Sequence, residues 1–255
     1  MKRIIKTDIL LVAFILFSAT GSAQKKKDIF SEENFGVNKS GTPITIQFEK
    51  GKYHNHPLFA IWLADEKGNY LQTLYVSESI GKGVFKHATR ANGKWMEGKI
   101  QRPAALPYWT HQRNVINEFG TYNPTEKHPV IDGYTGATPM SSFNLHTKTG
   151  RPLKGKYKIM LELNQCWDWN EYWTNDRYPN DIEYKTSSQP AVVYSVDIDT
   201  NSLKPFYIMK PIGHSHYSGA DGSLTTDLKT LTTALKIAKK NNRYNKLSLH
   251  ELIVT

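Results

Sequence analysis

The sequence predicts a mainly β protein, built as an antiparallel β-sandwich with long connections and one C-terminal helix. Short segments with an apolar residue at every second position recur along the chain, which is typical of strands. Helical spacing of apolar residues is clear only near the C-terminal end. The 255 residues are 39% hydrophobic and 12% aromatic, which is enough for a sizeable core. Many strands with one late helix favour a sandwich over an α/β fold.

The predicted strands lie before residue 77 and after residue 155, and most of them have a periodicity near two. Residues 43–49 place Ile44, Ile46 and Phe48 on one face. The run at 58–63 is almost wholly apolar, as in a central strand, and the DEKGN turn joins it to a strand at 70–76. Further strands are expected at 156–163, 191–198, 203–212 and 247–254.

Between residues 84 and 129 the strand pattern fades. This stretch holds Pro103, Pro107, Pro124 and Pro129 among Gly and Asn, and it is too long for an ordinary loop. We expect it to wrap the core and to contribute to function, with the aromatic LPYWTH segment at 106–111 as its anchor.

The single predicted helix covers residues 226–240. Its apolar residues recur at helical spacing, behind Thr225 or Thr226 as N-cap, and three lysines lie in the last turns, where the helix dipole favours cations. The apolar positions are Leu228, Leu231, Leu235 and Ala238.

The first 23 residues have the layout of a secretory signal peptide. A basic start precedes an apolar run from Ile9 to Phe17, and the small residues Gly21 and Ala23 place the cleavage after Ala23. The alternative is a membrane anchor, but the run is only about half of the ~20 residues that a span needs. We therefore expect a periplasmic or secreted protein without a membrane span after cleavage, with a flexible lead-in at 24–40 and one domain at 41–255.

The formal net charge is +10, and the lysines and arginines are scattered along the chain without a nucleic-acid-binding motif. We expect an envelope protein or a small ligand as partner, and no nucleic acid. The single cysteine, Cys166, excludes an internal disulfide and is expected to be a buried small hydrophobic residue.

The richest cluster of candidate ligand-binding residues is NQCWDWNEYW, at 164–173. Aromatic faces interleaved with carboxylates and amides suit a sugar or a cation, whereas the structural alternative is that the tryptophans plug one end of the core. The candidate residues are Trp167, Asp168, Trp169, Asn170, Glu171 and Trp173, with Tyr108 and Trp109 from the long connection as neighbours.

Two H-x-H pairs are candidate metal ligands. Residues two apart on a strand share a face, so His54 with His56 and His214 with His216 would form a zinc or copper site if their strands were neighbours. The alternative is that both pairs lie at exposed loop ends.

The TGATPM segment at 135–140 is similar to the motif at which exported flavoproteins receive FMN on a threonine. Met140 stands at the acceptor position and has no hydroxyl, so we expect no covalent FMN, and the sequence identifies no other cofactor. The alternative is a glycine-containing turn. No G-x-S-x-G, H-E-x-x-H or P-loop motif is present, so nothing in the sequence supports a catalytic residue.

These motifs, in their order along the chain, resemble the bacterial exported proteins of the domain-of-unknown-function 2271 family. The likeness covers most of the chain beyond Ile44. The resemblance implies an immunoglobulin-like β-sandwich and a link to exported redox systems, since such proteins tend to be encoded near flavin transferases and PepSY-type membrane proteins. It carries over no functional residue. The segments concerned are FAIWLADEKGNYLQTLYV, LPYW, DGYTGATP, GRPLKGKYKIMLE, NQCWDWNEYW, SSQPAVVYSVDID and GHSHYSGADGSLTTDLKTLTTA.

The sequence thus predicts an exported, non-catalytic binding or accessory domain of the bacterial envelope that serves a membrane redox or flavin-linked system. The alternative is an envelope redox protein that itself binds a metal or a flavin.

Overall fold

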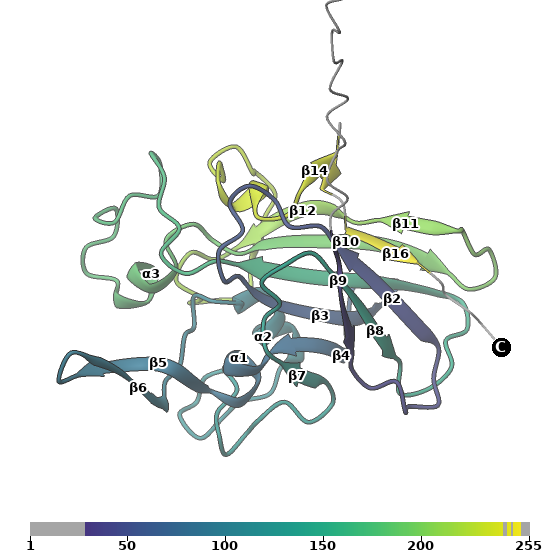
Figure 1. The fold of residues 1–255 in the computed structure, drawn as a ribbon, viewed down its shortest axis with the longest axis horizontal. Coiled ribbons are helices and arrows are strands. Elements are labelled where there is room, and N and C mark those ends of the chain that lie inside the picture. Colours follow the sequence, from purple (N-terminus) through teal and green to yellow (C-terminus); the bar gives the residue numbers. More distant parts are fainter. Residues whose placement is uncertain (1–28, 242–243, 246, 251–255) are drawn as a thin grey trace, which may run out of the picture.

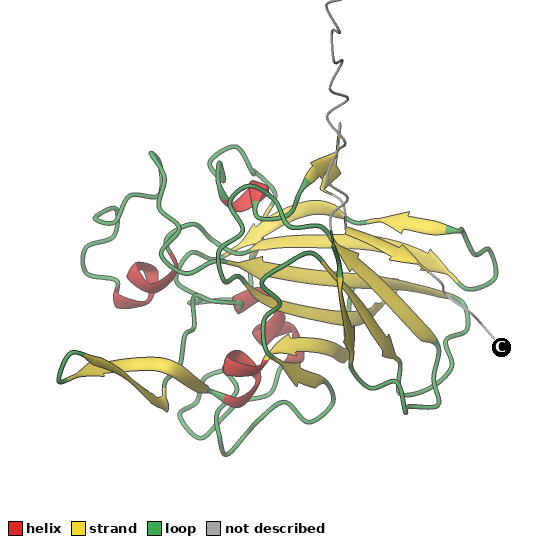
Figure 2. Ribbon diagram, in the orientation of Figure 1, coloured by secondary structure: helices red, strands yellow, loops and turns green. Residues whose placement is uncertain are grey.

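The chain is mainly β, as predicted, with two large sheets, two small two-stranded sheets and short helices (Figure 1 and Figure 2). The structure is a computed structural model that describes residues 29–241, 244–245 and 247–250. The predicted signal peptide lies outside the described residues. Across the described ranges, no helix has the length and apolar character of a membrane span.

The five-stranded sheet has the order β1-β8-β2-β16-β11, and only β1 and β8 are parallel. Its strands are β1 (Ser31–Asn34), β8 (Phe143–Lys148), β2 (Pro43–Phe48), β16 (Leu247–His250) and β11 (Phe206–Ile208).

The seven-stranded sheet has the order β13-β12-β10-β9-β3-β4-β7, and only the edge pair β4 and β7 is parallel. Its strands are β13 (Leu224–Thr225), β12 (Lys210–Ser215), β10 (Val192–Asp199), β9 (Lys156–Asn164), β3 (Leu58–Asp65), β4 (Tyr70–Ser77) and β7 (Tyr134–Gly136).

The smaller elements lie between these strands. They are α1 (Glu78–Lys82), α2 (Pro107–Arg113), α3 (Ile182–Ser187), the 3-10 helix η1 (Ala234–Lys236), the hairpin of β5 (Val84–Ala91) and β6 (Lys94–Lys99), and the pair β14 (Lys240–Asn241) and β15 (Tyr244–Asn245).

The two large sheets share one hydrophobic core, and β2 and β8 cross the strands β3, β9 and β10 in Figure 1. In β2 and β8 every second residue is buried, because one face meets the core and the other faces solvent. Phe48 and Phe143 stack with ring centroids 5.1 Å apart, and Phe59 of β3 meets both edge-on. Aromatic contacts thus join the two sheets.

The seven-stranded sheet is covered on its second face as well, which explains why β3 is apolar along almost its whole length. Phe59 and Ile61 face the shared core, whereas Ala60 and Trp62 belong to a second cluster with Trp109 of α2. The long connection at 84–129 therefore wraps the core, as the sequence predicts.

Two polar side chains of β9 hold this connection in place. The carboxylate of Glu162 accepts hydrogen bonds from the backbone amides of Tyr108 (3.2 Å) and Trp109 (2.7 Å), in the first turn of α2. Asn164, two residues along the same face, donates to the carbonyls of Ala104 (3.0 Å) and Ala105 (2.7 Å). Both side chains are buried, so these bonds satisfy groups that would otherwise be costly inside the protein.

The hairpin of β5 and β6 was missed by the sequence analysis. Its turn is Asn92-Gly93, and both residues have positive φ (50° and 75°), as a two-residue type I′ turn requires. The strands lack apolar alternation because most of their residues are exposed, and the hairpin projects from the sheets at the lower left of Figure 1.

The predicted C-terminal helix at 226–240 is wrong. The segment makes turns, and only Ala234–Lys236 is helical, as the 3-10 helix η1. Of its four predicted apolar positions, Leu231 and Ala238 are buried, and Leu228 and Leu235 are partly buried against the core. Its backbone and hydroxyl groups form hydrogen bonds with the loop after β9. The many threonines in this segment also disfavour a helix.

Three smaller predictions need correction. Residues 31–34 of the expected flexible lead-in form β1, which pairs with β8. The strand expected at 203–212 divides at Met209 into β11 and β12, which belong to different sheets. The apolar alternation of β8 was overlooked. The strand expected at 247–254 is seen as β16, and residues 251–255 lie outside the described part.

We predict that the free energy of unfolding falls as the pH rises from about 4.5 to about 8. Burial raises the pKa of Glu162 from 4.5 to about 8, so in this interval the folded protein holds a proton that the unfolded chain has lost. The loss is on the order of 4 kcal/mol over the interval and stops above it. Urea unfolding at several pH values measures this slope.

The control is Glu162→Gln, which cannot titrate. This variant should be less stable at low pH, because its amide can accept only one of the two N–H bonds, and its slope should be flatter than that of the unchanged protein. Equal slopes for the two proteins would contradict this account of Glu162.

Candidate functional site

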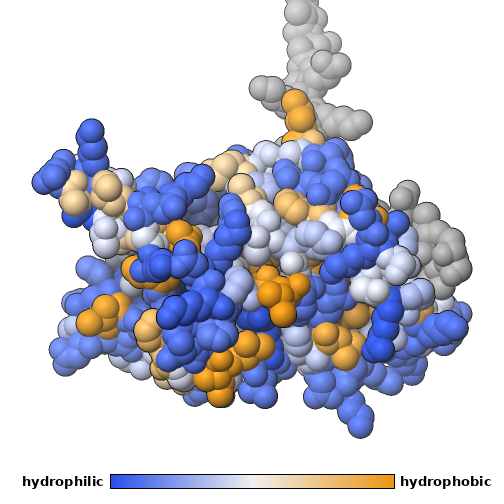
Figure 3. All heavy atoms as spheres, turned by 90° about the horizontal axis from the view of Figure 1, so that it is seen from below, coloured by the Kyte–Doolittle hydropathy of each residue, from blue (hydrophilic) through white to orange (hydrophobic). Residues whose placement is uncertain are grey.

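A cleft of about 1120 Å³ lies beside the β5–β6 hairpin. It lies on the side of the molecule where α1, β7 and the hairpin are found, and Figure 3 shows separate hydrophobic patches among polar atoms on that side. Its lining comes from segments far apart in sequence: Asn55, His56, Leu58, Glu78, Ser79, Lys82, Val84–Lys86, His87, Trp95, Glu97, Arg102, Glu126, Pro129, Gly136–Thr138, Met140, Cys166 and Trp167.

The hairpin supplies one aromatic wall of the cleft. Phe85 lies near its base, and Trp95 follows the turn on the other strand and is about half exposed. His87 meets Trp95 edge-on with ring centroids 5.8 Å apart. Large exposed rings that line a hollow are typical of ligand-binding surfaces.

Trp167, from a segment far from the hairpin in the chain, supplies a second aromatic wall of the cleft. Its backbone conformation is unusual. Its φ of 58° lies in the left-handed region, which a bulky residue rarely adopts, and its side chain is 50% exposed. The following residue, Asp168, forms a parallel β-bridge with Ser188, which also has positive φ (74°). The bridge holds the Trp167 ring at the cleft, and strained backbone of this kind is often found at functional sites.

Arg102 joins the two aromatic walls. Its guanidinium carbon lies 4.9 Å from the ring centre of Phe85 and 5.4 Å from that of Trp167, which is cation–π geometry. Arg102 is only 9% exposed, although it lines the cleft. No sequence pattern marks Arg102, because the rings that it contacts come from segments that are distant in the chain.

The TGATPM segment also reaches the cleft. Gly136, Ala137, Thr138 and Met140 line it, and the Thr138 hydroxyl forms a 2.9 Å hydrogen bond with the hydroxyl of Ser77. Residues 134–136 form β7, and residues 137–142 form a loop that leads into β8. Met140 is partly exposed and presents a thioether to the cleft, so the position that would accept FMN has no hydroxyl.

Cys166 was predicted to be a buried small hydrophobic residue; it is partly buried, packs against the second cluster and lines the same cleft. Burial raises the pKa of its thiol, which favours the neutral thiol over the nucleophilic thiolate.

The polar residues of the tryptophan cluster are structural. The side-chain oxygen of Asn170 accepts hydrogen bonds from the backbone amides of Tyr172 (2.9 Å) and Trp173 (2.7 Å). Its side-chain nitrogen donates to the carbonyl of Thr230 (2.7 Å). Asp168 accepts a 2.7 Å hydrogen bond from the Thr233 hydroxyl, and burial raises the pKa of its carboxyl. These bonds tie the loop after β9 to the segment that was expected to be helical.

The four predicted tryptophans lie in four different environments. Trp173 is 6% exposed and belongs to the shared core, whereas Trp109 is fully buried on the other face of the seven-stranded sheet. Trp169 and Glu171 are exposed but do not line the cleft. Of the predicted cluster only Trp167 lines the cleft, so the sequence proposal of a single surface that includes Trp109 and Trp173 is wrong.

The four histidines do not form a metal site. No group of three or more His, Cys, Asp or Glu side chains that could hold a metal ion occurs among the described residues. His56 has positive φ in a loop, so His54 and His56 do not lie on one strand face. His214 is buried at the end of β12 against Trp173, and His216 lies beyond that strand.

His54 is half-buried, and neither of its ring nitrogens has a hydrogen-bond partner in the structure. Burial lowers the pKa of its imidazole to about 4. It is therefore neutral near pH 7, and its ring lies against Phe48 with centroids 5.7 Å apart.

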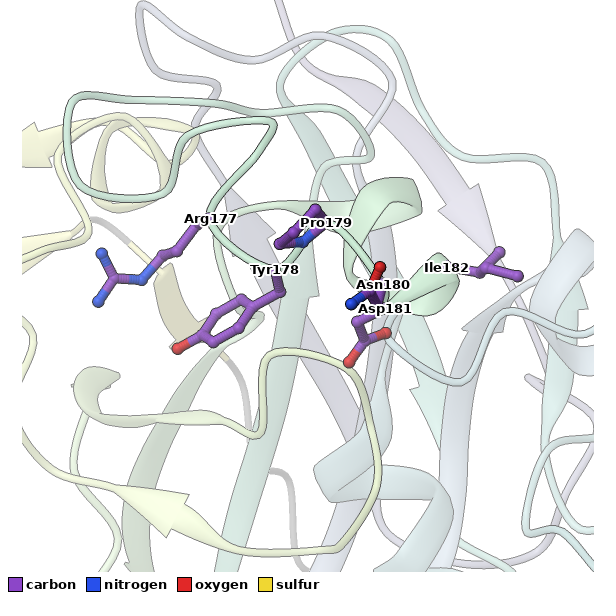
Figure 4. A pocket seen from close by; sticks show the side chains of 6 residues that line it. All are labelled: Arg177, Tyr178, Pro179, Asn180, Asp181 and Ile182. Carbon is purple, nitrogen blue, oxygen red and sulfur yellow. The ribbon is translucent and has the colours of Figure 1, made fainter.

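A second hollow, of about 560 Å³, is formed by residues 177–182 alone. Figure 4 shows that these side chains fan outward from one stretch of loop, with Arg177 and Ile182 pointing in opposite directions. The Arg177 guanidinium instead lies over the ring of Tyr172, 3.7 Å from its centre. Because the side chains do not converge, the larger cleft is the better candidate site.

Comparison with known proteins gave no match to a protein-family model, to a curated protein or to a solved structure. The case for the cleft therefore depends on its own geometry.

We predict opposite outcomes for two tryptophans of the cluster. Trp173→Ala should lower the free energy of unfolding by about 3–5 kcal/mol, because it leaves a cavity in the shared core and an unpaired hydroxyl on Thr230, which accepts the indole N–H at 3.1 Å. Trp169→Ala should change it by less than about 0.5 kcal/mol. Urea unfolding compares the two variants, and similar losses for both would show that the burial of these rings is assigned wrongly.

Proposed function

We propose that this protein is an exported binding or accessory domain of the bacterial envelope, without catalytic activity of its own, and that its ligand binds in the cleft. The single observation that carries the proposal is the joining of Phe85, Arg102 and Trp167, from three distant segments, around one hollow of ligand size. The signal-peptide layout of residues 1–23 supports export.

The polar groups of the cleft support binding rather than catalysis. Within the described lining, no hydroxyl or thiol is hydrogen-bonded to a histidine, which is the arrangement that activates a nucleophile. Its charged groups are instead placed around aromatic rings, as at a recognition site.

We further propose an immunoglobulin-like β-sandwich as the fold. Two facing sheets with a shared core, joined largely by antiparallel pairs, support this proposal, as does the resemblance to the 2271 family. The parallel edge pairs β1–β8 and β4–β7 and the long covering connection are additions to such a sandwich.

A second candidate function is flavin binding within an envelope redox system. One observation favours it: the TGATPM segment lines the same cleft as the aromatic rings. The residues do not fit covalent attachment, because Met140 replaces the hydroxyl acceptor. A metal-based redox function has no ligand set among the described histidines.

The proposal is tested by native mass spectrometry of the full-length protein, purified from the envelope of cells that export it. We expect a bound small molecule in the unchanged protein and in Trp169→Ala, whose ring lies outside the cleft, but not in Trp167→Ala. Loss of the molecule from both variants, or its absence from all three proteins, contradicts binding in the cleft. A flavin absorption spectrum of the purified protein would favour the second candidate.

We predict that co-expression with a flavin transferase adds no FMN to the protein. The reason is that the transfer forms a phosphoester with a hydroxyl, and Met140 has none. Intact-mass measurement decides the question, and a gain of one FMN mass that disappears in Thr138→Ala or Ser141→Ala would contradict the prediction.

A further inference from the structure

Arg102 is a buried cation without an ion-pair partner among the described residues. Its side chain is nine-tenths buried, and no carboxylate or carbonyl of the described chain accepts a hydrogen bond from its guanidinium. Two other cations near the cleft do form ion pairs: Lys82 with Glu78, and Lys99 with Glu126. Unlike Lys82 and Lys99, Arg102 has no carboxylate partner among the described residues.

The carbon stem of Arg102 is packed among other residues, while its guanidinium lines the cleft. The faces of Phe85 and Trp167 stabilise its charge but give its N–H groups no acceptor. Burial and the charge of Asp181 raise the pKa of Glu183, and the charge of Arg102 opposes them, but Arg102 and Glu183 form no ion pair. The planar edge of the guanidinium, with its five N–H donors, is suited to an oxyanion.

We propose that Arg102 recognises an oxyanion, and that the cleft takes a small molecule in which a carboxylate or phosphate is joined to an aromatic ring. This inference rests on the proposed function and specifies its ligand. The oxyanion would pair with Arg102, and the ring would lie against the exposed aromatic wall that Trp95 and Trp167 provide.

The remaining charges of the cleft agree with one anionic group. Lys86 is an exposed cation at the hairpin wall, and Glu97, on the neighbouring strand, is an exposed carboxylate. Glu97 would repel a second anionic group, so a ligand with one oxyanionic group and a neutral ring is favoured over one with several anionic groups.

The test is a calorimetric titration of the full-length protein with four single-ring probes. Phenyl phosphate and benzoate carry the two oxyanions, benzyl alcohol is neutral, and benzylamine is a cation. We expect one of the two anions to bind at least tenfold more tightly than benzyl alcohol, and benzylamine to bind most weakly. The ranking of phenyl phosphate against benzoate shows which oxyanion is preferred.

The matched variants are Arg102→Gln and Lys94→Gln. Lys94 belongs to the neighbouring β5–β6 hairpin and does not line the cleft. Replacing it with glutamine changes the net charge by the same amount as Arg102→Gln. Arg102→Gln should weaken anion binding by about 10- to 100-fold and leave benzyl alcohol unaffected, whereas Lys94→Gln should change neither.

Two results overturn the inference. One is equal affinity of the unchanged protein for the anions and benzyl alcohol, or no saturable binding of either anion; this measurement needs no variant and stands even if Arg102→Gln does not fold. The other is equal weakening by Arg102→Gln and Lys94→Gln. If benzyl alcohol binds and Trp167→Ala abolishes that binding, the cleft remains the site although the oxyanion is wrong; if Trp167→Ala has no effect on any probe, the proposed function falls too.

Discussion

The hydrogen bonds from Tyr108 and Trp109 to the carboxylate of Glu162 are the interaction on which the rest of this structure depends. They fix the first turn of α2 to the middle of the seven-stranded sheet, where β3 and β10 flank β9. With α2 in place, Trp109 covers the second face of the sheet and donates its indole N–H to the hydroxyl of Thr73 (3.2 Å). A buried carboxyl group is costly, and it is tolerated here because both oxygens have donors and because burial, which raises its pKa to about 8, keeps it mainly protonated near neutral pH.

The position of the cleft follows from the same anchor. Arg102 lies just before the segment that Glu162 and Asn164 hold, and the hairpin lies just before Arg102. At its C-terminal end, β9 continues directly into Cys166 and Trp167. The same strand therefore positions Trp167 on one side of the cleft and, through Glu162 and Asn164, the long connection on the other. The core of the sheets is therefore the support of the site, and the exposed rings and Arg102 are presented by segments attached to it.

The sequence was sufficient for the parts of the fold in which one face of a strand is buried and the other is not. The alternation in β2 and the apolar run in β3 predicted those strands because their burial is regular. The hairpin has no such pattern, yet its Asn92-Gly93 turn was a readable signal that was overlooked. The expected helix at 226–240 failed for a different reason, since its apolar spacing is real but Asn170, Asp168 and Gln189 bind its backbone and threonines.

For the site, the sequence identified Trp167, His56 and the TGATPM segment, but it grouped them with the wrong partners. Trp167 and Trp173 are close in the chain, yet Trp167 is half exposed at the cleft and Trp173 is buried in the shared core. The backbone changes direction between them, beginning with the positive φ of Trp167. Arg102 was unreadable because its role arises from contacts with rings 17 and 65 positions away in the chain, at Phe85 and Trp167. Only the folded arrangement brings these groups together.

Hydrogen exchange at the amides of Tyr108 and Trp109 is the most direct test of this account. If Glu162 anchors the long connection, these two amides should exchange as slowly as those in the middle of β9, through global unfolding only. The amides of the exposed β5–β6 hairpin should exchange much faster and serve as the internal reference. If the amides of Tyr108 and Trp109 exchange at hairpin rates, the anchor does not hold the long connection, and the central claim is wrong.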